Sequence, residues 1–183
     1  MPHHTKAILA TGFYTGMRKG EILSLTWAKV DLKNRAIRLE AQDTKDKEPR
    51  TIPIGNDLYL ILKSMPRAVH DDHVFLYEGK PLKDIRTSFY KACLDVGIKT
   101  GRAERDGLVF HDLRHTFNTN MRKAGVSESV IMAITGHATR EMFDRYNTVD
   151  STDKKQAVAQ MDAFFKNVDQ MVDQEELTQE KRG

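Results

Sequence analysis

The sequence predicts an α+β domain that is mostly α-helical, with a small three-stranded antiparallel sheet near its N-terminus. Two observations support this fold class. Short stretches in which apolar and polar residues alternate lie between residues 26 and 54, with turn residues between them. After Gly55, apolar residues recur at helical spacing, and glycines follow several of these segments.

The first third of the chain supplies two short helices and three strands. We expect the helices at residues 4–15 and 18–25, and the strands at residues 26–32, 36–41 and 51–54. Asn34 supplies the turn between the first two strands, and the polar stretch 42–50 forms a long loop before the third. This arrangement is a small antiparallel meander.

The remaining two thirds are expected to be helices joined by loops. The helices are expected at residues 56–65, 84–97, 111–125, 127–136 and 140–148, and from 152 to about 177. Residues 71–82 are expected to be a loop with a short extended piece, and residues 100–110 a polar loop. Ser127 is placed to cap the start of one helix, and Gly136 lies just past its end.

Composition limits the class of protein. A chain of 183 residues is long enough for one domain with its own core. A single cysteine, Cys93, excludes an internal disulfide framework and a multi-cysteine metal cluster. No apolar run approaches the ~20 residues needed to span a bilayer, and the N-terminus lacks the layout of a signal peptide. We therefore expect a soluble protein of the cytoplasm.

Charge is distributed unevenly along the chain. Residues 169–183 hold five acidic and two basic residues, a net charge of −3. The whole chain carries +3, so the other 168 residues carry +6. A basic body with an acidic tail suits a polyanionic partner, although many ordinary enzymes share this pattern.

Several polar residues stand where apolar ones would pack more easily, and each has an ordinary explanation when taken alone. Arg18 can pair with Glu21 three residues later, as exposed arginines often do. His137 can cap a helix end, Tyr146 can belong to the core, and the lysines of the loop 42–50 can be solvated. Taken singly, these residues indicate no function.

A zinc site is disfavoured. His111 and His115 are four residues apart on one predicted helix, which is a spacing that metal ligands use. However, the run reads HDLRH and not HExxH, and Arg114 between the two histidines would repel a cation. We expect no metal and no cofactor.

Taken together, five separated motifs resemble one family. They are TGMRKGEILSL, the loop TKDKEPRTIP with Lys45 eight residues before Pro53, HDLRHTF, ITGH, and a tyrosine nine residues after the histidine of ITGH. In this order and at these spacings they resemble the catalytic domain of the tyrosine recombinases, the phage integrase family. The resemblance covers about residues 5–165 and implies the helical fold that this family shares with type IB topoisomerases.

The resemblance implies that six side chains act on one DNA phosphodiester and that one more supports them. The six are Arg18, Lys45, His111, Arg114, His137 and Tyr146, and the supporting residue is Glu21. Tyr146 would attack the phosphorus and form a 3′-phosphotyrosyl bond. Arg18 and Arg114 would hold the non-bridging oxygens of the scissile phosphate.

The other residues would move protons or bind the phosphate. His111 would assist proton movement at the tyrosine hydroxyl, and His137 would donate a hydrogen bond to the phosphate. Lys45 would protonate the departing 5′-oxygen, with Lys47 as the alternative candidate two residues later. These roles fit the chemistry, because guanidiniums match phosphate oxygens and stay charged, so no metal is needed to neutralise the transition state.

The resemblance also implies an organisation and a partner. We expect a catalytic domain over residues 1–168 and an acidic tail over 169–183, with the N-terminal core-binding domain of the family absent. The partner would be double-stranded DNA, on which the chain would form a homotetramer through its C-terminal helix, and it would be a monomer when free. The setting would be the nucleoid of a prokaryote, or a phage or other mobile element.

Two other functions remain open at this point. A type IB topoisomerase-like enzyme would use the same residues to relax supercoils without paired sites. A non-catalytic DNA-binding module is the third possibility, but simple binding does not require two arginines, two histidines and a tyrosine around one phosphate. The motif HDLRHTF and the nine-residue spacing from the histidine of ITGH to the tyrosine favour a site-specific DNA recombinase.

Overall fold

The computed structural model describes residues 3–101, 107–136 and, within 151–165, all but residues 152, 153 and 156. The chain divides into two units, residues 1–146 and 147–183. The helices of the first unit are α1 (His3–Thr15), α2 (Lys19–Leu23), α3 (Asn56–Lys63), α4 (Arg86–Asp95), α5 (Asp112–Lys123) and α6 (Glu128–Thr135). Its strands are β1 (Val30–Asp31), β2 (Ala36–Leu39), β3 (Arg50–Pro53), β4 (Leu76–Tyr77) and β5 (Lys80–Pro81). The described residues of this unit also form two 3₁₀ turns, η1 (Trp27–Lys29) and η2 (Ala41–Asp43).

The three-stranded antiparallel sheet has the order β1-β2-β3, which confirms the predicted meander. Ile37 pairs with Ile52 across β2 and β3, and both side chains are fully buried. On the alternate positions, Arg38 faces Thr51 and both are exposed. One face of the sheet therefore packs on the core, as the alternation in the sequence requires.

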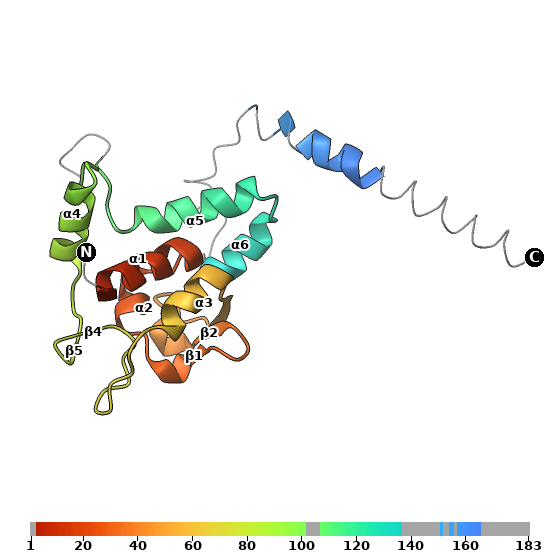
Figure 1. Cartoon of the computed structure of the whole chain (residues 1–183). Helices are drawn as coiled ribbons and strands as arrows, with labels where there is room; N and C mark the ends of the chain where they lie inside the picture. Colours follow the sequence, from red (N-terminus) through yellow and green to blue (C-terminus); the bar gives the residue numbers. More distant parts are fainter. Residues whose placement is uncertain (1–2, 102–106, 137–150, 152–153, 156, 166–183) are drawn as a thin grey trace, which may run out of the picture. The chain divides into compact units, whose positions relative to one another are not determined.

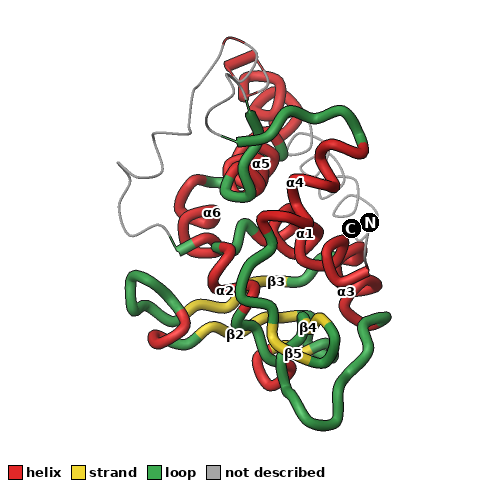
Figure 2. Tube along the Cα trace, turned by 90° about the vertical axis from the view of Figure 1, so that its left-hand side faces the viewer, coloured by secondary structure: helices red, strands yellow, loops and turns green. Residues whose placement is uncertain are grey.

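Helix α1 lies at the centre of the described part of the first unit. Figure 1 shows α5 alongside α1, and Figure 2 shows the sheet on the opposite side of α1 from α5. Ile8 of α1 is completely buried, together with Ile22 of α2, Leu58 of α3 and Phe75, which directly precedes β4. Two buried threonines of α1 satisfy their hydroxyls within the helix: Thr11 donates to the carbonyl of Ala7 at 2.8 Å, and Thr15 donates to the carbonyl of Thr11.

The predicted first strand is partly wrong. Residues 27–29 form η1, and β1 is only two residues long. The cause is a contact distant in the sequence: the N–H of Trp27 donates to the carbonyl of Asp72 at 2.8 Å, and the N–H of Val74 donates to the carbonyl of Leu25 at 2.8 Å. The segment 71–82, predicted as a loop with an extended piece, supplies these partners and then forms the β4–β5 hairpin.

The predicted helix ends agree with the structure at several glycines. Gly136 follows α6 in the left-handed conformation, with φ of 70°, and its N–H bonds the carbonyl of Met132. Ser127 stands at the cap position of α6, but its hydroxyl faces that of Ser129 and makes no capping bond. The expected helix 140–148 and the tail 169–183 lie outside the described residues.

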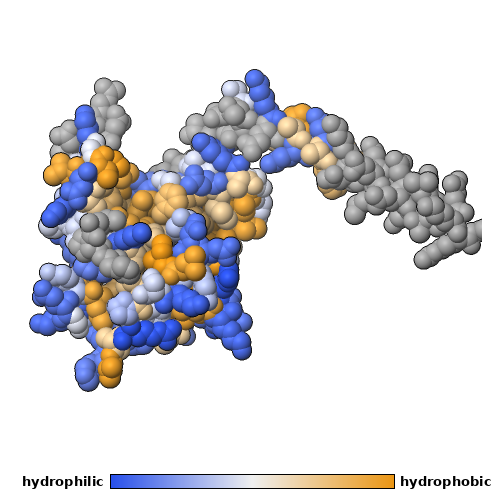
Figure 3. Space-filling view, in the orientation of Figure 1, coloured by the Kyte–Doolittle hydropathy of each residue, from blue (hydrophilic) through white to orange (hydrophobic). Residues whose placement is uncertain are grey.

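The second unit contributes helical residues within 151–165. Four large apolar side chains on this segment are more than half exposed within the structure: Val158, Met161, Phe164 and Phe165. Figure 3 shows apolar side chains on this segment beside charged ones. Among the helices described, none is long and apolar enough to cross a membrane.

Candidate active site

Arg18 is fixed at the start of α2 by Glu21. The backbone of Arg18 is extended, and its N–H donates to Oε2 of Glu21 at 2.9 Å, while its Nη1 donates to Oε1 of the same carboxylate at 3.2 Å. Glu21 is 4% exposed, so its carboxylate is a buried anion that requires partners. This reciprocal pair orients the guanidinium of Arg18 from within its own helix turn.

Arg114 reaches the same place from α5. It is 2% exposed, and its Nη1 donates to the carbonyl of Gly16 at 2.7 Å, two residues before Arg18. Burial, together with the nearby positive charge of Arg18, lowers the pKa of Arg114 to about 10, while the carboxylate of Glu21 opposes the shift. Arg114 therefore stays charged at neutral pH.

Arg50 joins this cluster and was not singled out from the sequence. It begins β3, donates from Nη2 to Oε2 of Glu21 at 2.6 Å and from Nε to the carbonyl of Ile134 at 3.1 Å. Its side chain is 6% exposed. The alternation in the sequence could have indicated this position, because Arg50 lies two residues before buried Ile52 and so shares the core-facing side of the strand. Arg50 thereby ties the sheet to α2 and to the end of α6.

Two glycines allow the backbone to approach these arginines closely. A Cβ on Gly16, whose φ is +63°, would lie 2.7 Å from Cδ1 of Phe117. A Cβ on Gly136, whose φ is +70°, would lie 2.9 Å from Nη1 of Arg50. Both positions therefore require glycine for conformation and for space.

The loop between β2 and β3 closes over Arg18. Nη2 of Arg18 donates to Oδ2 of Asp46 at 2.6 Å and to the carbonyl of Gly136 at 3.1 Å. Thr44 is buried, and its hydroxyl accepts from the N–H of Glu48 at 3.0 Å, which closes the base of the loop. The two candidate lysines, Lys45 and Lys47, flank Asp46, and both are exposed.

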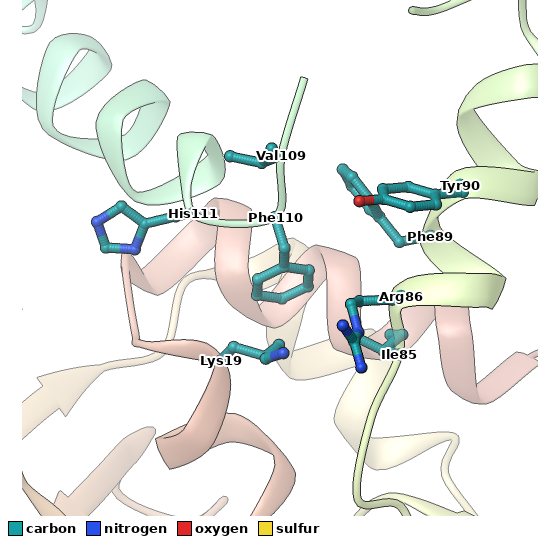
Figure 4. A pocket seen from close by; sticks show the side chains of 8 residues that line it. All are labelled: Lys19, Ile85, Arg86, Phe89, Tyr90, Val109, Phe110 and His111. Carbon is teal, nitrogen blue, oxygen red and sulfur yellow. The ribbon is translucent and has the colours of Figure 1, made fainter. Parts of the chain in front are cut away.

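His111 stands at the N-cap of α5, exposed at the surface, one turn before Arg114. Its ring meets that of His115 edge-on, with the centroids 4.9 Å apart. Burial lowers the pKa of His115, and His111 and Arg114 lower it further while Asp112 opposes them. His111 also borders a cleft of about 310 Å³; Figure 4 shows it and Lys19 across the cleft from Tyr90.

The structure thus brings together Arg18, Glu21 and Arg114, with Arg50 and Asp46 added to them. Lys45 lies next to Asp46 in the chain, and His111 lies on the helix that carries Arg114. His137 and Tyr146 lie outside the described residues. The described cluster can bind and polarise an anionic group, because it has more guanidiniums than carboxylates.

Comparison with known proteins decides the family. Residues 1–153 match the phage integrase family. The chain belongs to the phage integrase family. The resemblance inferred from the five motifs is confirmed, and so is the mostly helical α+β fold class.

Relatives of this integrase-family chain act in DNA rearrangement according to their names. It is 31% identical over 150 residues to the shufflon-specific DNA recombinase of Escherichia coli, covering 81% of this chain and 35% of that protein. It is also 31% identical over 157 residues to the tyrosine recombinase XerD of Halalkalibacterium halodurans, covering 80% and 50%. The chain therefore spans about a third to a half of the length of these curated relatives.

Solved structures agree with the family assignment. The catalytic domain of bacteriophage HP1 integrase is 31% identical, with a TM-score of 0.56, and the match covers 76% of this integrase-family chain and 71% of that one. The crystal structure of XerA recombinase has the same fold, with a TM-score of 0.68 at 22% identity, covering 87% and 57%.

Proposed function

We propose that this chain is the catalytic part of a site-specific DNA recombinase that cleaves and rejoins strands through a 3′-phosphotyrosyl intermediate, without a metal or cofactor. The observation that carries the proposal is the meeting of Arg18 and Arg114 from separate helices at one carboxylate-braced cluster. Arginines buried together this way repel one another, and an anion such as a phosphodiester relieves that repulsion.

In the proposed reaction, Oη of Tyr146 attacks the phosphorus, and the bond from phosphorus to the 5′-oxygen breaks. Arg18 and Arg114 hold the non-bridging oxygens, and their fixed charges stabilise the added charge of the pentacoordinate transition state. His137 donates a further hydrogen bond to the phosphate. Fixed cations can supply in this way the stabilisation that metal pairs supply in many nucleases.

Protons move at both ends of the displacement. His111 assists removal of the phenolic proton of Tyr146, whose ordinary pKa of about 10 makes it a poor nucleophile unaided. Lys45 gives a proton to the departing 5′-oxygen. Its exposure on the loop leaves it able to approach a bound strand from outside, and its spacing to Pro53 favours it over Lys47.

Glu21 acts through the arginines and not on the substrate. Its carboxylate accepts hydrogen bonds from Arg18 and Arg50, and it is buried beneath them. It therefore orients the guanidiniums from the side opposite to a bound phosphate. The covalent intermediate conserves the energy of the phosphodiester, so the strand can be rejoined without ATP.

The helical segment within 151–165 supports the proposed assembly on DNA. Its exposed apolar side chains, Phe164 and Phe165 among them, form a surface that a neighbouring protomer would cover in a tetramer. The free chain would be a monomer. Work on DNA would place the protein at the nucleoid of a prokaryotic host or in a phage-infected cell.

The test is covalent capture of DNA. A pool of nicked duplexes with randomised sequence around the nick is incubated with the chain in EDTA. The nick is used because cleavage beside it releases a short product that diffuses away, so the strand cannot be rejoined and the covalent intermediate is trapped. We expect an adduct that survives denaturation, and its selected sequence reports the target site. Tyr146→Phe removes the adduct and keeps the ring.

Two outcomes would contradict the proposal. One is an adduct that forms only with a divalent metal, and the other is an adduct that persists in Tyr146→Phe. Relaxation of a supercoiled plasmid that carries no selected site would instead favour the topoisomerase-like alternative.

A further inference from the structure

The cluster of arginines is closed on its open side by a carboxylate of the chain itself. Arg114 and Arg50 are almost fully buried, whereas the side chain of Arg18 is 18% exposed and that of Asp46 is 23% exposed. Asp46 binds Nη2 of Arg18 at 2.6 Å. An anion arriving from solvent therefore meets the pair of Arg18 and Asp46 before it meets Arg114 or Arg50.

Asp46 binds as a phosphate oxygen would. Its Oδ2 takes a short, charge-assisted hydrogen bond from a guanidinium nitrogen, which is the contact that arginine makes with phosphodiesters. The other bonds of Arg18 go to Glu21 and to the carbonyl of Gly136, which brace the guanidinium from inside the fold. Of the acceptors described around Arg18, Asp46 is the one on an exposed loop.

The contacts of Arg18 favour exchange over addition. The three guanidiniums exceed the carboxylates of Glu21 and Asp46 by one positive charge. A phosphodiester monoanion that replaces Asp46 leaves this balance unchanged. A phosphodiester that arrived beside Asp46 would cancel the excess charge, but it would place a second anion on a guanidinium whose Nη2 Asp46 already binds at 2.6 Å, and the two anions would repel each other.

We propose that Asp46 is an internal competitor of DNA, a carboxylate that holds Arg18 until the scissile phosphate displaces it. The inference rests on the proposed role of Arg18 in binding that phosphate. Because Lys45 is the adjacent residue, the movement of the loop that withdraws Asp46 also moves the proposed acid. DNA binding and the placing of the acid are thereby coupled in one displacement.

The test compares two variants that change the charge equally. Asp46→Asn and Glu48→Gln each remove one negative charge from the same loop, and Glu48 is exposed. Binding of a fluorescein-labelled 30-base-pair duplex is measured by anisotropy at one salt concentration. We expect Asp46→Asn to bind about 5-fold more tightly than Glu48→Gln, as loss of one competing ion pair predicts. We also expect its rate of adduct formation to rise.

The melting temperature and a second substitution show whether loss of the ion pair between Asp46 and Arg18 causes the gain in affinity. Asp46→Asn is expected to lower the melting temperature of the free chain relative to Glu48→Gln, since the ion pair with Arg18 stabilises only the DNA-free form. In an Arg18→Gln background the gain in affinity is expected to disappear. Trypsin cleavage after Lys45 or Lys47 is expected to accelerate in Asp46→Asn.

The outcomes separate the two ideas. Equal affinities of Asp46→Asn and Glu48→Gln for DNA contradict the competition, and so does a gain in affinity that persists in the Arg18→Gln background. In either case the proposed function is upheld as long as the parent chain forms the Tyr146 adduct. Absence of the adduct in the parent chain contradicts the proposed function itself.

Discussion

Arg114 shows how the fold prepares one side chain for an anion. Burial and the neighbouring charge of Arg18 lower its pKa to about 10, which measures how poorly the site solvates the cation. The pKa still lies well above neutral pH, so the charge is kept. A bound phosphodiester would offset this cost, and the arginine therefore gains more from an anion than an exposed arginine does.

His115 predicts how stability depends on pH. Burial lowers its pKa below the ordinary value of 6.5, so the unfolded chain takes up this proton first as the pH falls. The free energy of unfolding is therefore expected to decrease as the pH drops from 6.5 through the lower folded pKa. Urea denaturation at pH 7.5, 6.5 and 5.5 measures it, and His115→Gln is expected to flatten the dependence. An unchanged slope in His115→Gln would assign the effect to another group.

At the scale of elements, the connection from α1 to α2 depends on Gly16. Its left-handed backbone turns the chain so that its carbonyl accepts from Arg114, and Phe117 and Thr135 occupy the space where a Cβ would lie. The connection therefore sets the distance between α1 and α5 as well as the direction of Arg18.

Gly16→Ala is expected to lower the free energy of unfolding by about 2–5 kcal/mol, because the strained φ and the clash with Phe117 both oppose a Cβ. Urea denaturation followed by circular dichroism measures the loss. Gly20→Ala is the matched control: its Cβ meets nothing within 4 Å in α2, and it is expected to stabilise the chain by about 0.5–1 kcal/mol. Similar effects of the two substitutions would refute the packing argument.

The strand β3 and the loop before it show the limit of local patterns. Alternation predicted the strand and the glycine predicted the end of α6, since both depend on neighbouring residues. The strand pattern can place Arg50 on the core-facing side, but it identifies no partner for Arg50 or Asp46, because their partners, Glu21 and Arg18, lie 29 and 28 residues away. Contacts of this range are fixed only when the fold is complete.

At the scale of the whole molecule, the sequence was most informative where several signals agreed. Ordered motifs predicted the family, helical periodicity predicted α3, and periodicity with a terminal glycine predicted α4, α5 and α6. It was least informative where the chain pairs with a distant segment, as at η1, whose Trp27 bonds Asp72. The roles of the site residues remain predictions, and those of His137 and Tyr146 concern positions outside the described residues.

The second unit leads to a prediction about assembly. Phe164→Ser combined with Phe165→Ser is expected to abolish multimers on DNA that carries paired target sites, because the apolar contact between protomers is lost. Adduct formation on a single site is expected to stay unchanged. Analytical ultracentrifugation measures the complexes. Leu94→Ser removes a side chain that is 77% exposed on α4 and serves as the control. Multimers that survive the double substitution would place the contact elsewhere.

The oxygens that anchor Arg114 and Arg18 at Gly16 and Gly136 belong to peptide groups. Every amino acid carries such an oxygen, so no change of codon at either position can delete the acceptor. What divergence can damage is the path of the main chain through the two bends. A diverged sequence would therefore keep both hydrogen-bond acceptors for as long as the two bends keep their left-handed backbone, whichever residues change around them.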